Sequence, residues 1–286
     1  MMQTIIDGLV QGSIYGLAAI GLSLIFGVVR VPHFAHGEAV MLGGMVGLTL
    51  VADSGAPLLV GLVVGTLAAT AFGLVVGAAV FYPLREFSEI NLLITALALV
   101  FIVEAAATKV FGEQPRVIPG APDGSVQFLG AQVGVMRIII LGVALIGAIG
   151  LHGYVERSRT GHAMKALALN PAAARLMGIP VRRYWILAFV IGSALAGIAG
   201  VLLGTIVPVT PTMGALISLK SFIVIIFAGL GSIGGAYAGG LILGLVEALG
   251  GSYISSGYIN AFSIAFLVAV LLVRPQGMFA AGVARD

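Results

Sequence analysis

Long apolar runs recur from one end of this chain to the other, and they constrain its fold more than any other feature. A helix that crosses a bilayer needs roughly 20 predominantly apolar residues, and the chain offers such a run repeatedly. Of its 286 residues, 60% are hydrophobic and 9% are charged, which excludes an ordinary soluble domain. The sequence therefore predicts an all-α, polytopic membrane helical bundle that forms a single transmembrane domain over residues 1–286.

The apolar runs predict eight or nine transmembrane segments. The second run has only 15 residues, and Pro32 and Gly37 interrupt helical continuity before it. We therefore expect a broken helix near residues 30–38. The expected segments are Ile5–Val29, Gly37–Val51, Pro57–Tyr82, Leu92–Phe111, Val133–Tyr154, Tyr184–Val207, Met213–Gly229, Ile233–Gly250 and Ile259–Val273.

The charges predict the orientation of the bundle. Six of the fourteen basic residues lie between Val155 and Arg183, where Glu156 is the single acid, so loop 155–183 is expected to be cytoplasmic. Nine passages then place the N-terminus and the Gly112–Gln132 loop outside. No basic region precedes Ile5, so the first run is expected to be a retained span. The absence of cysteine excludes disulfides and thiolate metal sites.

The run NPAAARLMG at 170–178 predicts a short helix within the basic loop. Asn170 suits the N-cap, Pro171 the first helical position and Gly178 the position after the last turn. About two turns of helix are not stable alone in water, so contact with another element or protein is expected to hold them. Leu176 and Met177 offer apolar side chains for that contact. The alternative is a capped turn in an ordinary loop.

Polar residues within the broken segment are expensive in a membrane unless they are paired or line a cavity. His33, His36 and Glu38 predict either part of a translocation pathway or a structural corner that caps helix ends. A metal site of the form His33-x-x-His36-x-Glu38 is the third alternative, although the helix breakers disfavour it. For four isolated polar residues in apolar spans, snorkelling, interhelical pairing and transport all stay open: Glu104, Lys109, Lys220 and Glu247.

Glycine is abundant within the apolar spans, with 42 residues in the chain. Gly231, Gly235 and Gly239 repeat at four-residue spacing, and such small-residue faces let helix backbones approach closely. We expect this face to pack helices, with Gly240 and Gly244 on a neighbouring track. Leu243 is expected to face a looser environment.

No phosphate-binding G-x-x-x-x-G-K-[ST] loop occurs, so the chain is not expected to hydrolyse ATP itself. The chain instead resembles the permeases of ABC importers for branched-chain amino acids, in particular the shorter of the two permeases in such a system. The resemblance covers nearly the whole chain. It is carried by GLSLIFGVVRVPHFAHGE at Gly21–Glu38, FYPLR at Phe81–Arg85, ERSRTGHAMKALALNPAAARLMGI at Glu156–Ile179, KSFIVIIFAGLGSIGGAYAGGLILGLVEAL at Lys220–Leu249 and RPQGMF at Arg274–Phe279.

The resemblance implies a bacterial inner-membrane permease without enzymatic activity, cofactor or metal of its own. Its implied partners are a second permease, two cytoplasmic ATPases that use ATP and Mg, and a periplasmic binding protein that delivers leucine, isoleucine or valine; nothing implies nucleic acid. The implied ATPase-coupling residues are Asn170, Pro171, Ala173, Ala174, Leu176, Met177 and Gly178. The candidate pathway residues are His33, Phe34, His36, Glu38 and Lys220. The alternatives are a urea or short-chain amide importer and an ion-coupled secondary transporter.

Overall fold

The computed structural model describes residues 1–128, 130–274 and 277–279. Pro275 and Gln276 of the RPQGMF motif lie outside the described residues. Helices dominate these ranges, as the composition predicts. The helices are α1 (Met2–Val29), α2 (His36–Leu48), α3 (Leu58–Val75), α4 (Tyr82–Leu84), α5 (Glu89–Phe111), α6 (Val135–Arg157), α7 (Arg159–Leu169), α8 (Pro171–Leu176), α9 (Val181–Gly204), α10 (Met213–Ala228), α11 (Ile233–Tyr253) and α12 (Ile259–Val273), and the strands are β1 (Ser125–Phe128) and β2 (Ala131–Gly134).

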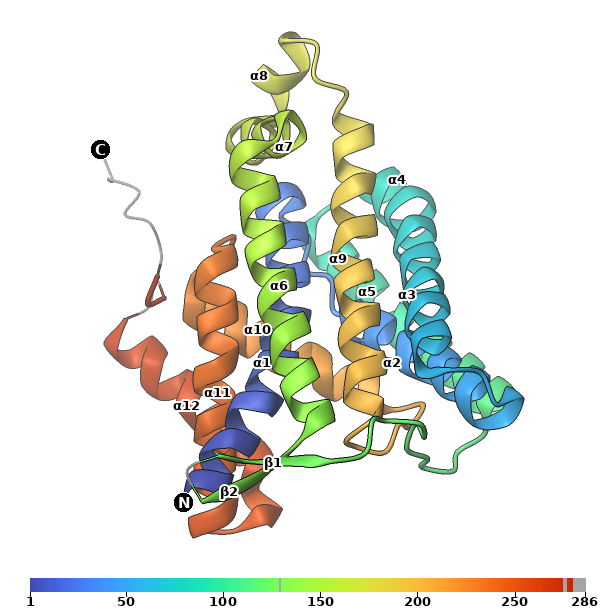
Figure 1. Ribbon diagram of the computed structural model, residues 1–286. Helices are drawn as coiled ribbons and strands as arrows, with labels where there is room; N and C mark the ends of the chain where they lie inside the picture. The colour runs from blue at the N-terminus through green and yellow to red at the C-terminus, as the bar shows by residue number, and fades with distance from the viewer. Residues whose placement is uncertain (129, 275–276, 280–286) are drawn as a thin grey trace.

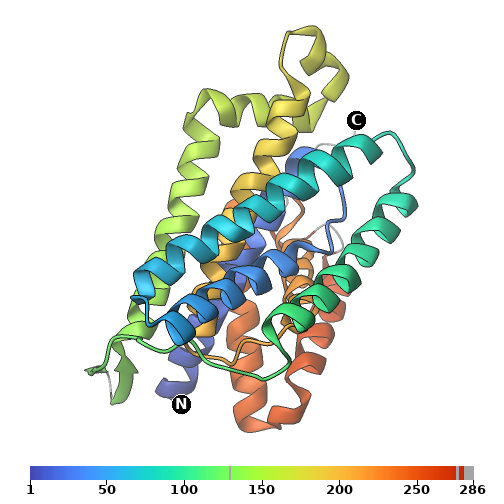
Figure 2. The same cartoon turned by 90° about the vertical axis from the view of Figure 1, so that its right-hand side faces the viewer.

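The bundle has two distinct ends (Figures 1 and 2). Helices α7 and α8 project from one end, which we call the α8 end. The N-terminus and the antiparallel β1–β2 hairpin lie at the opposite end, which we call the hairpin end. The sequence does not predict the hairpin, because residues 125–132 fall in the expected outer loop and Val133 and Gly134 in the expected span. Its position opposite α8 agrees with the prediction that the Gly112–Gln132 loop and the basic loop 155–183 lie on opposite sides.

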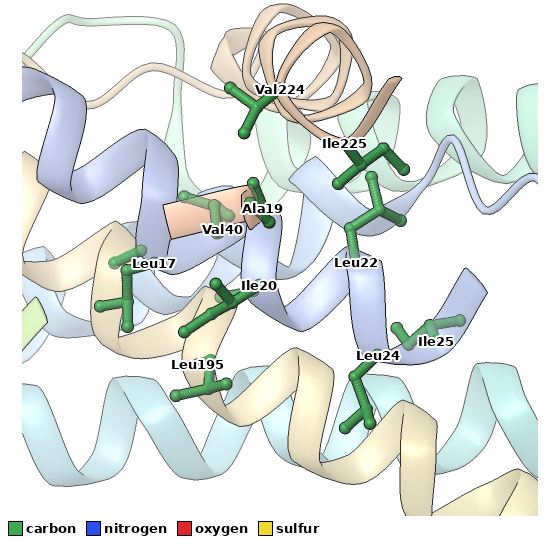
Figure 3. Close-up of a cluster of buried hydrophobic side chains, with 14 of the residues drawn as sticks. Leu17, Ala19, Ile20, Leu22, Leu24, Ile25, Val40, Leu195, Val224 and Ile225 are labelled. Atoms are coloured by element: carbon green, nitrogen blue, oxygen red, sulfur yellow. The ribbon is translucent and has the colours of Figure 1, made fainter. Parts of the chain in front are cut away.

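Helix α1 is the centre of the bundle. In its most apolar 18-residue stretch, 89% of the residues are buried. In the segment Ser256–Val273, only 6% of the residues are buried. A helix that is apolar on every face is buried on every face, and α1 packs most extensively against α11 and α9. Figure 3 shows Leu17, Ile20 and Leu22 of α1 among side chains from α2, α9 and α10.

Glycines bring α1 and α11 into backbone contact. A Cβ on Gly12 would lie 2.6 Å from the Gly240 carbonyl oxygen, and a Cβ on Gly240 or Gly244 would collide with the Cα of Gly16 or Gly12. Such an approach is impossible for any larger residue. The four-residue spacing therefore does predict close packing, but on the track of Gly240 and Gly244.

The track of Gly231, Gly235 and Gly239 also packs against neighbouring segments, but mostly against side chains rather than backbone. Gly239 faces the side chain of Phe227, since a Cβ on Gly239 would lie 2.9 Å from Cδ1 of that ring, and Gly235 faces the Ser232 side chain and Phe279. Gly231 lies in the turn before α11 at φ 87°, a conformation that favours glycine. The expectation for Leu243 is wrong, because its side chain is fully buried.

The helix break is present at the predicted place. Helix α1 ends at Arg30 in the left-handed conformation with φ 55°, and α2 begins only at His36. The His36 Nε2 atom lies 3.0 Å from the Ala18 carbonyl oxygen, so α2 starts beside the middle of α1. The 13 residues of α2 continue as five π-helical residues to Asp53, which makes this segment a short helix that begins within the bundle.

The described residues contain seven helices that are long and apolar enough to cross a membrane. Two expected spans are shorter: α10 has 16 residues and α2 has 13. Eight or nine continuous crossings are therefore not confirmed, because two of the apolar runs form helices too short to span a bilayer alone. The polytopic helical membrane bundle is confirmed.

Candidate coupling surface and buried polar break

Helix α8 forms as its sequence predicts. The Asn170 side-chain oxygen accepts hydrogen bonds from the amides of Ala172 and Ala173, each at 3.0 Å, and Pro171 occupies the first turn. Gly178 follows the helix at φ 79°, where a side chain would be strained. The N-cap, the first turn and the C-terminal end of α8 are thus determined by residues that are adjacent in the sequence. The sequence alone was therefore sufficient to predict them.

The side chains of α8 divide between bundle and solvent. Ala174 is fully buried, whereas Leu176 is 90% exposed and Met177 is 69% exposed. Leu169, at the end of α7, is also 82% exposed. Three large apolar side chains therefore stand in solvent at the α8 end, and clustered exposed apolar side chains mark interaction surfaces. We call Leu169, Leu176 and Met177 the apolar tip.

Helix α7 was not predicted as a separate element. Ser158 caps it, accepting a hydrogen bond from the Gly161 amide at 2.9 Å, and Met164 and Leu167 are buried on one face. The signal in the sequence was this serine followed by apolar residues three apart. The Arg30 guanidinium donates to the Ala168 carbonyl at 2.9 Å, which ties the end of α1 to α7.

The histidines of the break lie in a packed aromatic environment. His33 and His36 are both fully buried. The His33 ring centroid lies 5.2 Å from that of Phe81 and 5.1 Å from that of Phe189. The break therefore contacts α9 through Phe189, whose helix begins directly after the α8 segment.

Ser218 of α10 holds the start of α2 in place. Its hydroxyl accepts a hydrogen bond from the Gly37 amide at 2.7 Å and donates to the Phe34 carbonyl. Phe34 stacks on Phe222, also on α10, with 4.2 Å between ring centroids. The Gly37 amide and the Phe34 carbonyl, which the break frees, are thus satisfied by a neighbouring helix, as irregular backbone in a membrane requires.

Within the described part of the chain, the Glu38 carboxylate lacks such a partner, as do both ring nitrogens of His33. Its side chain is fully buried, and neither carboxylate oxygen has a hydrogen-bond partner among the described residues. Gly214 of α10 packs directly on this carboxylate, where any larger residue would collide with it. A buried carboxylate without a partner is costly, so residues of this kind mark functional positions in membrane proteins.

Lys220 lies apart from the break in a second polar network. Its Nζ is 2.8 Å from Glu247 Oε2 and donates to the Tyr15 hydroxyl at 2.8 Å. Ser263 of α12 donates to the other Glu247 oxygen. Of the interpretations left open for Lys220 and Glu247, the structure thus shows interhelical pairing. This network joins α1, α10, α11 and α12.

No group of three or more metal-ligating side chains occurs within residues 1–128, 130–274 and 277–279. His33, Phe34, His36 and Glu38 are brought together at the break, whereas Lys220 is held elsewhere by Glu247. Asn170, Pro171, Ala173, Ala174, Leu176, Met177 and Gly178 together form α8 and its two ends.

Comparison with known proteins extends over nearly the whole chain. Residues 4–273 match the family model described as branched-chain amino acid transport system, permease component. The high-affinity branched-chain amino acid transport system permease protein LivH of Escherichia coli K12 is 33% identical over 97% of this chain and 94% of its own length. The corresponding BraD protein of Pseudomonas aeruginosa is also 33% identical, over 97% and 95% of the two chains.

More distant relatives share the same extent. A probable branched-chain amino acid transport permease protein LivH of Methanocaldococcus jannaschii is 28% identical over 96% of this chain and 91% of its own. Among solved structures, PsaBC from Streptococcus pneumoniae in complex with Fab aligns with a TM-score of 0.51, covering 94% of this chain and 91% of that one. At 15% identity this likeness concerns the fold alone.

Proposed function

Because this chain belongs to the permease component family of branched-chain amino acid transport systems, we propose that it is one permease subunit of an ATP-driven importer in the bacterial inner membrane. Its cargo is a branched-chain amino acid: leucine, isoleucine or valine. A periplasmic binding protein delivers the cargo at the hairpin end, and the α8 end faces the cytoplasm. A second permease completes the channel.

The apolar tip carries this proposal. Leu176 is 90% exposed on a capped helix of six residues, and so short a helix requires support from outside itself. The chain has no nucleotide-binding loop, so the energy of transport comes from two separate ATPase subunits with bound ATP and Mg. Helix α8 with Leu176 and Met177 docks into one of these subunits.

Helix α9 transmits movement of α8 into the membrane. It starts at Val181, three residues after Gly178, and packs against α1, α2 and α3. Near its far end, Gly200 packs against the backbone of Val40 so closely that no side chain fits between them. A rigid helix in contact with α2 moves the polar break when α8 is displaced. Alternating access then results from rocking of the bundle about a site near the midplane.

The break is the part of the bundle suited to line the pathway. Helix α2 starts beside the middle of α1, and Glu38 in its first turn keeps an unpartnered carboxylate among the described residues. Discontinuous helices that begin near the midplane are the usual elements of transporter sites, because their free backbone groups and polar side chains can meet a polar cargo. His36 and Phe34 position this turn, and Glu38 faces the pathway when the bundle opens.

Reconstituted uptake tests the proposal. Proteoliposomes with this chain, the second permease and both ATPases should accumulate labelled leucine only when ATP and the binding protein are supplied. Isoleucine and valine should compete, whereas urea and acetamide should not. Uptake driven by a proton gradient without ATP would overturn the proposal in favour of an ion-coupled transporter, and competition by urea or acetamide alone would reassign the cargo.

A further inference from the structure

An open cavity of about 850 Å³ lies at the α8 end, and the first residues of the break, Arg30 and Pro32, form part of its edge. The last turns of α1 and α6, one side of α7 and the turn before α11 form its walls. This volume falls in the range of binding sites for medium-sized ligands. The cavity reaches Leu169 of the apolar tip, but Leu176 and Met177 do not line it, and neither do the buried histidines and Glu38 of the break. The proposed transport cycle does not use it.

The walls combine apolar and charged side chains. Leucine, isoleucine, phenylalanine and methionine side chains from four segments line the cavity: Leu24, Phe26, Met164, Leu169, Leu230 and Ile233. The charged and polar lining residues are Ser23, Arg30, Glu89, His152, Glu156, Lys165 and Ser232. Such a lining fits an amphiphile better than a fully polar metabolite, because the apolar walls need an apolar part of the ligand to cover them.

The charges favour a ligand that carries both signs. Lys165 Nζ lies 2.5 Å from Glu156 Oε1, so these two charges largely compensate each other. Arg30 and Glu89 then supply one cation and one anion. Arg30 uses one of its five N–H donors on the Ala168 carbonyl, and a guanidinium matches a phosphate well. A primary ammonium, with three donors, matches the Glu89 carboxylate.

The hydroxyl of Ser23 is a second, independent indication that the cavity binds a ligand. Its side chain is 1% exposed, and its hydroxyl has no hydrogen-bond partner among the described residues although it lines the cavity. Buried hydroxyls are normally hydrogen-bonded, because an unsatisfied one costs free energy. A polar headgroup atom in the cavity would satisfy it.

We propose that this cavity binds a phospholipid whose headgroup carries a phosphate and a primary ammonium. The apolar lining residues come from helix ends at the membrane boundary, where lipid headgroups lie, and basic pockets between helices on that side are suited to lipid phosphates. The bound lipid touches Lys165 and Leu169 of α7, directly before α8. The bound lipid therefore stabilises the orientation of α8. The cytoplasmic orientation of the cavity rests on the proposed function, whereas binding of the lipid does not depend on the cargo.

A large side chain introduced at Gly234 is expected to fill part of the cavity. It lines the cavity, and a Cβ at this position meets no atom within 4 Å. Because the Cβ position is open, Gly234→Phe should place its ring in the space of the ligand. Gly142 of α6 is the matched control, because it also has open space around its Cβ position but does not line the cavity.

The measurement is native mass spectrometry of the full chain after incubation with an equal mixture of phosphatidylethanolamine, phosphatidylcholine and phosphatidylglycerol. Phosphatidylethanolamine should be retained preferentially, with a loss of about tenfold in Gly234→Phe and little loss in Gly142→Phe. Equal retention of the three lipids, or an unchanged Gly234→Phe, would overturn the proposal. Displacement of the lipid by free leucine would also overturn it and assign the cavity to an amino acid.

A second variant tests the headgroup chemistry. Phosphatidylcholine has the same phosphate but no N–H donor, so Glu89→Gln should abolish the preference for phosphatidylethanolamine over phosphatidylcholine. Glu86→Gln should keep the preference, since Glu86 is exposed, pairs with Arg85 and does not line the cavity. Retention of the preference in Glu89→Gln contradicts the assigned role of Glu89. Lipid retention is measured without ATP or cargo, so failure here is separable from failure of the transport proposal.

Discussion

Lys220 Nζ and Glu247 Oε2 lie 2.8 Å apart in the interior of the bundle, with side chains only 6% and 5% exposed. They belong to α10 and α11, and the Tyr15 hydroxyl of α1 contacts both. Two charges taken out of water and lipid headgroups are stable only when they are paired. The pair therefore fixes the relative position of α1, α10 and α11.

Removal of one charge from this pair should be far more harmful than removal of both. Lys220→Met leaves a buried unpaired carboxylate, which typically costs about 3–5 kcal/mol, whereas the double variant Lys220→Met, Glu247→Leu removes that charge. Thermal unfolding in detergent should show a large loss for the single variant and partial recovery for the double one. Lys109→Met, at an exposed position of α5, serves as the control. Additive losses in the double variant would contradict the pairing argument.

Charge on the apolar tip should uncouple the ATPases. Leu176→Asp with Met177→Asp places unpaired carboxylates in a contact that excludes water, at a cost of several kcal/mol. Co-purification of the ATPases and uptake should fall together by at least about tenfold. Val117→Asp, in an exposed loop away from α8, should leave both unchanged. Normal assembly and uptake in the double variant would show that α8 does not dock.

The cap of α8 should depend on the oxygen of residue 170. Asn170→Ala removes two hydrogen bonds at 3.0 Å and should destabilise the helix by about 1 kcal/mol. Asn170→Asp retains an acceptor and favours the helix N-terminus. Amide hydrogen exchange over residues 171–176 should therefore accelerate in the alanine variant and stay slow in the aspartate variant. Equal exchange in both variants would mean that packing of Ala174, not the cap, holds α8.

The two glycine tracks of α11 should respond differently to a methyl group. Gly240→Ala inserts a Cβ into the Gly16 backbone, which cannot move away, and overpacking of this kind costs about 1–3 kcal/mol. Gly239→Ala meets side-chain atoms of Phe227 and Val224 rather than backbone, and side chains can shift by a few tenths of an ångström more easily than a backbone can. The melting temperature and yield in detergent should thus fall for Gly240→Ala and change little for Gly239→Ala. The reverse order would contradict the assignment of the close-packed track.

Substitutions at the break should affect transport without affecting assembly. Glu38→Gln keeps the volume of the side chain but removes its charge, and His36→Ala removes the hydrogen bond to the Ala18 carbonyl. Both variants should lower uptake while ATPase co-purification is retained, because α8 lies at the end of the bundle. If a protein with both changes folds and transports normally, the break is only a structural corner.

The sequence by itself was sufficient for features that contiguous residues determine. Apolar runs predicted a polytopic bundle, because exposure of an apolar helix to water costs free energy wherever its neighbours lie. Asn170, Pro171 and Gly178 predicted the ends of α8, since caps and stops act within one helical turn. Pro32 and Gly37 predicted the break for the same local reason.

Pairings between distant segments were decided only by the tertiary structure. Lys220 and Glu247 were isolated polar positions in the sequence, and only the packing of α10 against α11 brings them together. Gly239 and Gly240 have the same local chemistry, but the rotation of α11 about its axis directs Gly240 to α1 and Gly239 to Phe227. Helix rotation and contact partners depend on the sum of many weak packing interactions along the whole bundle, which no single segment of the sequence contains.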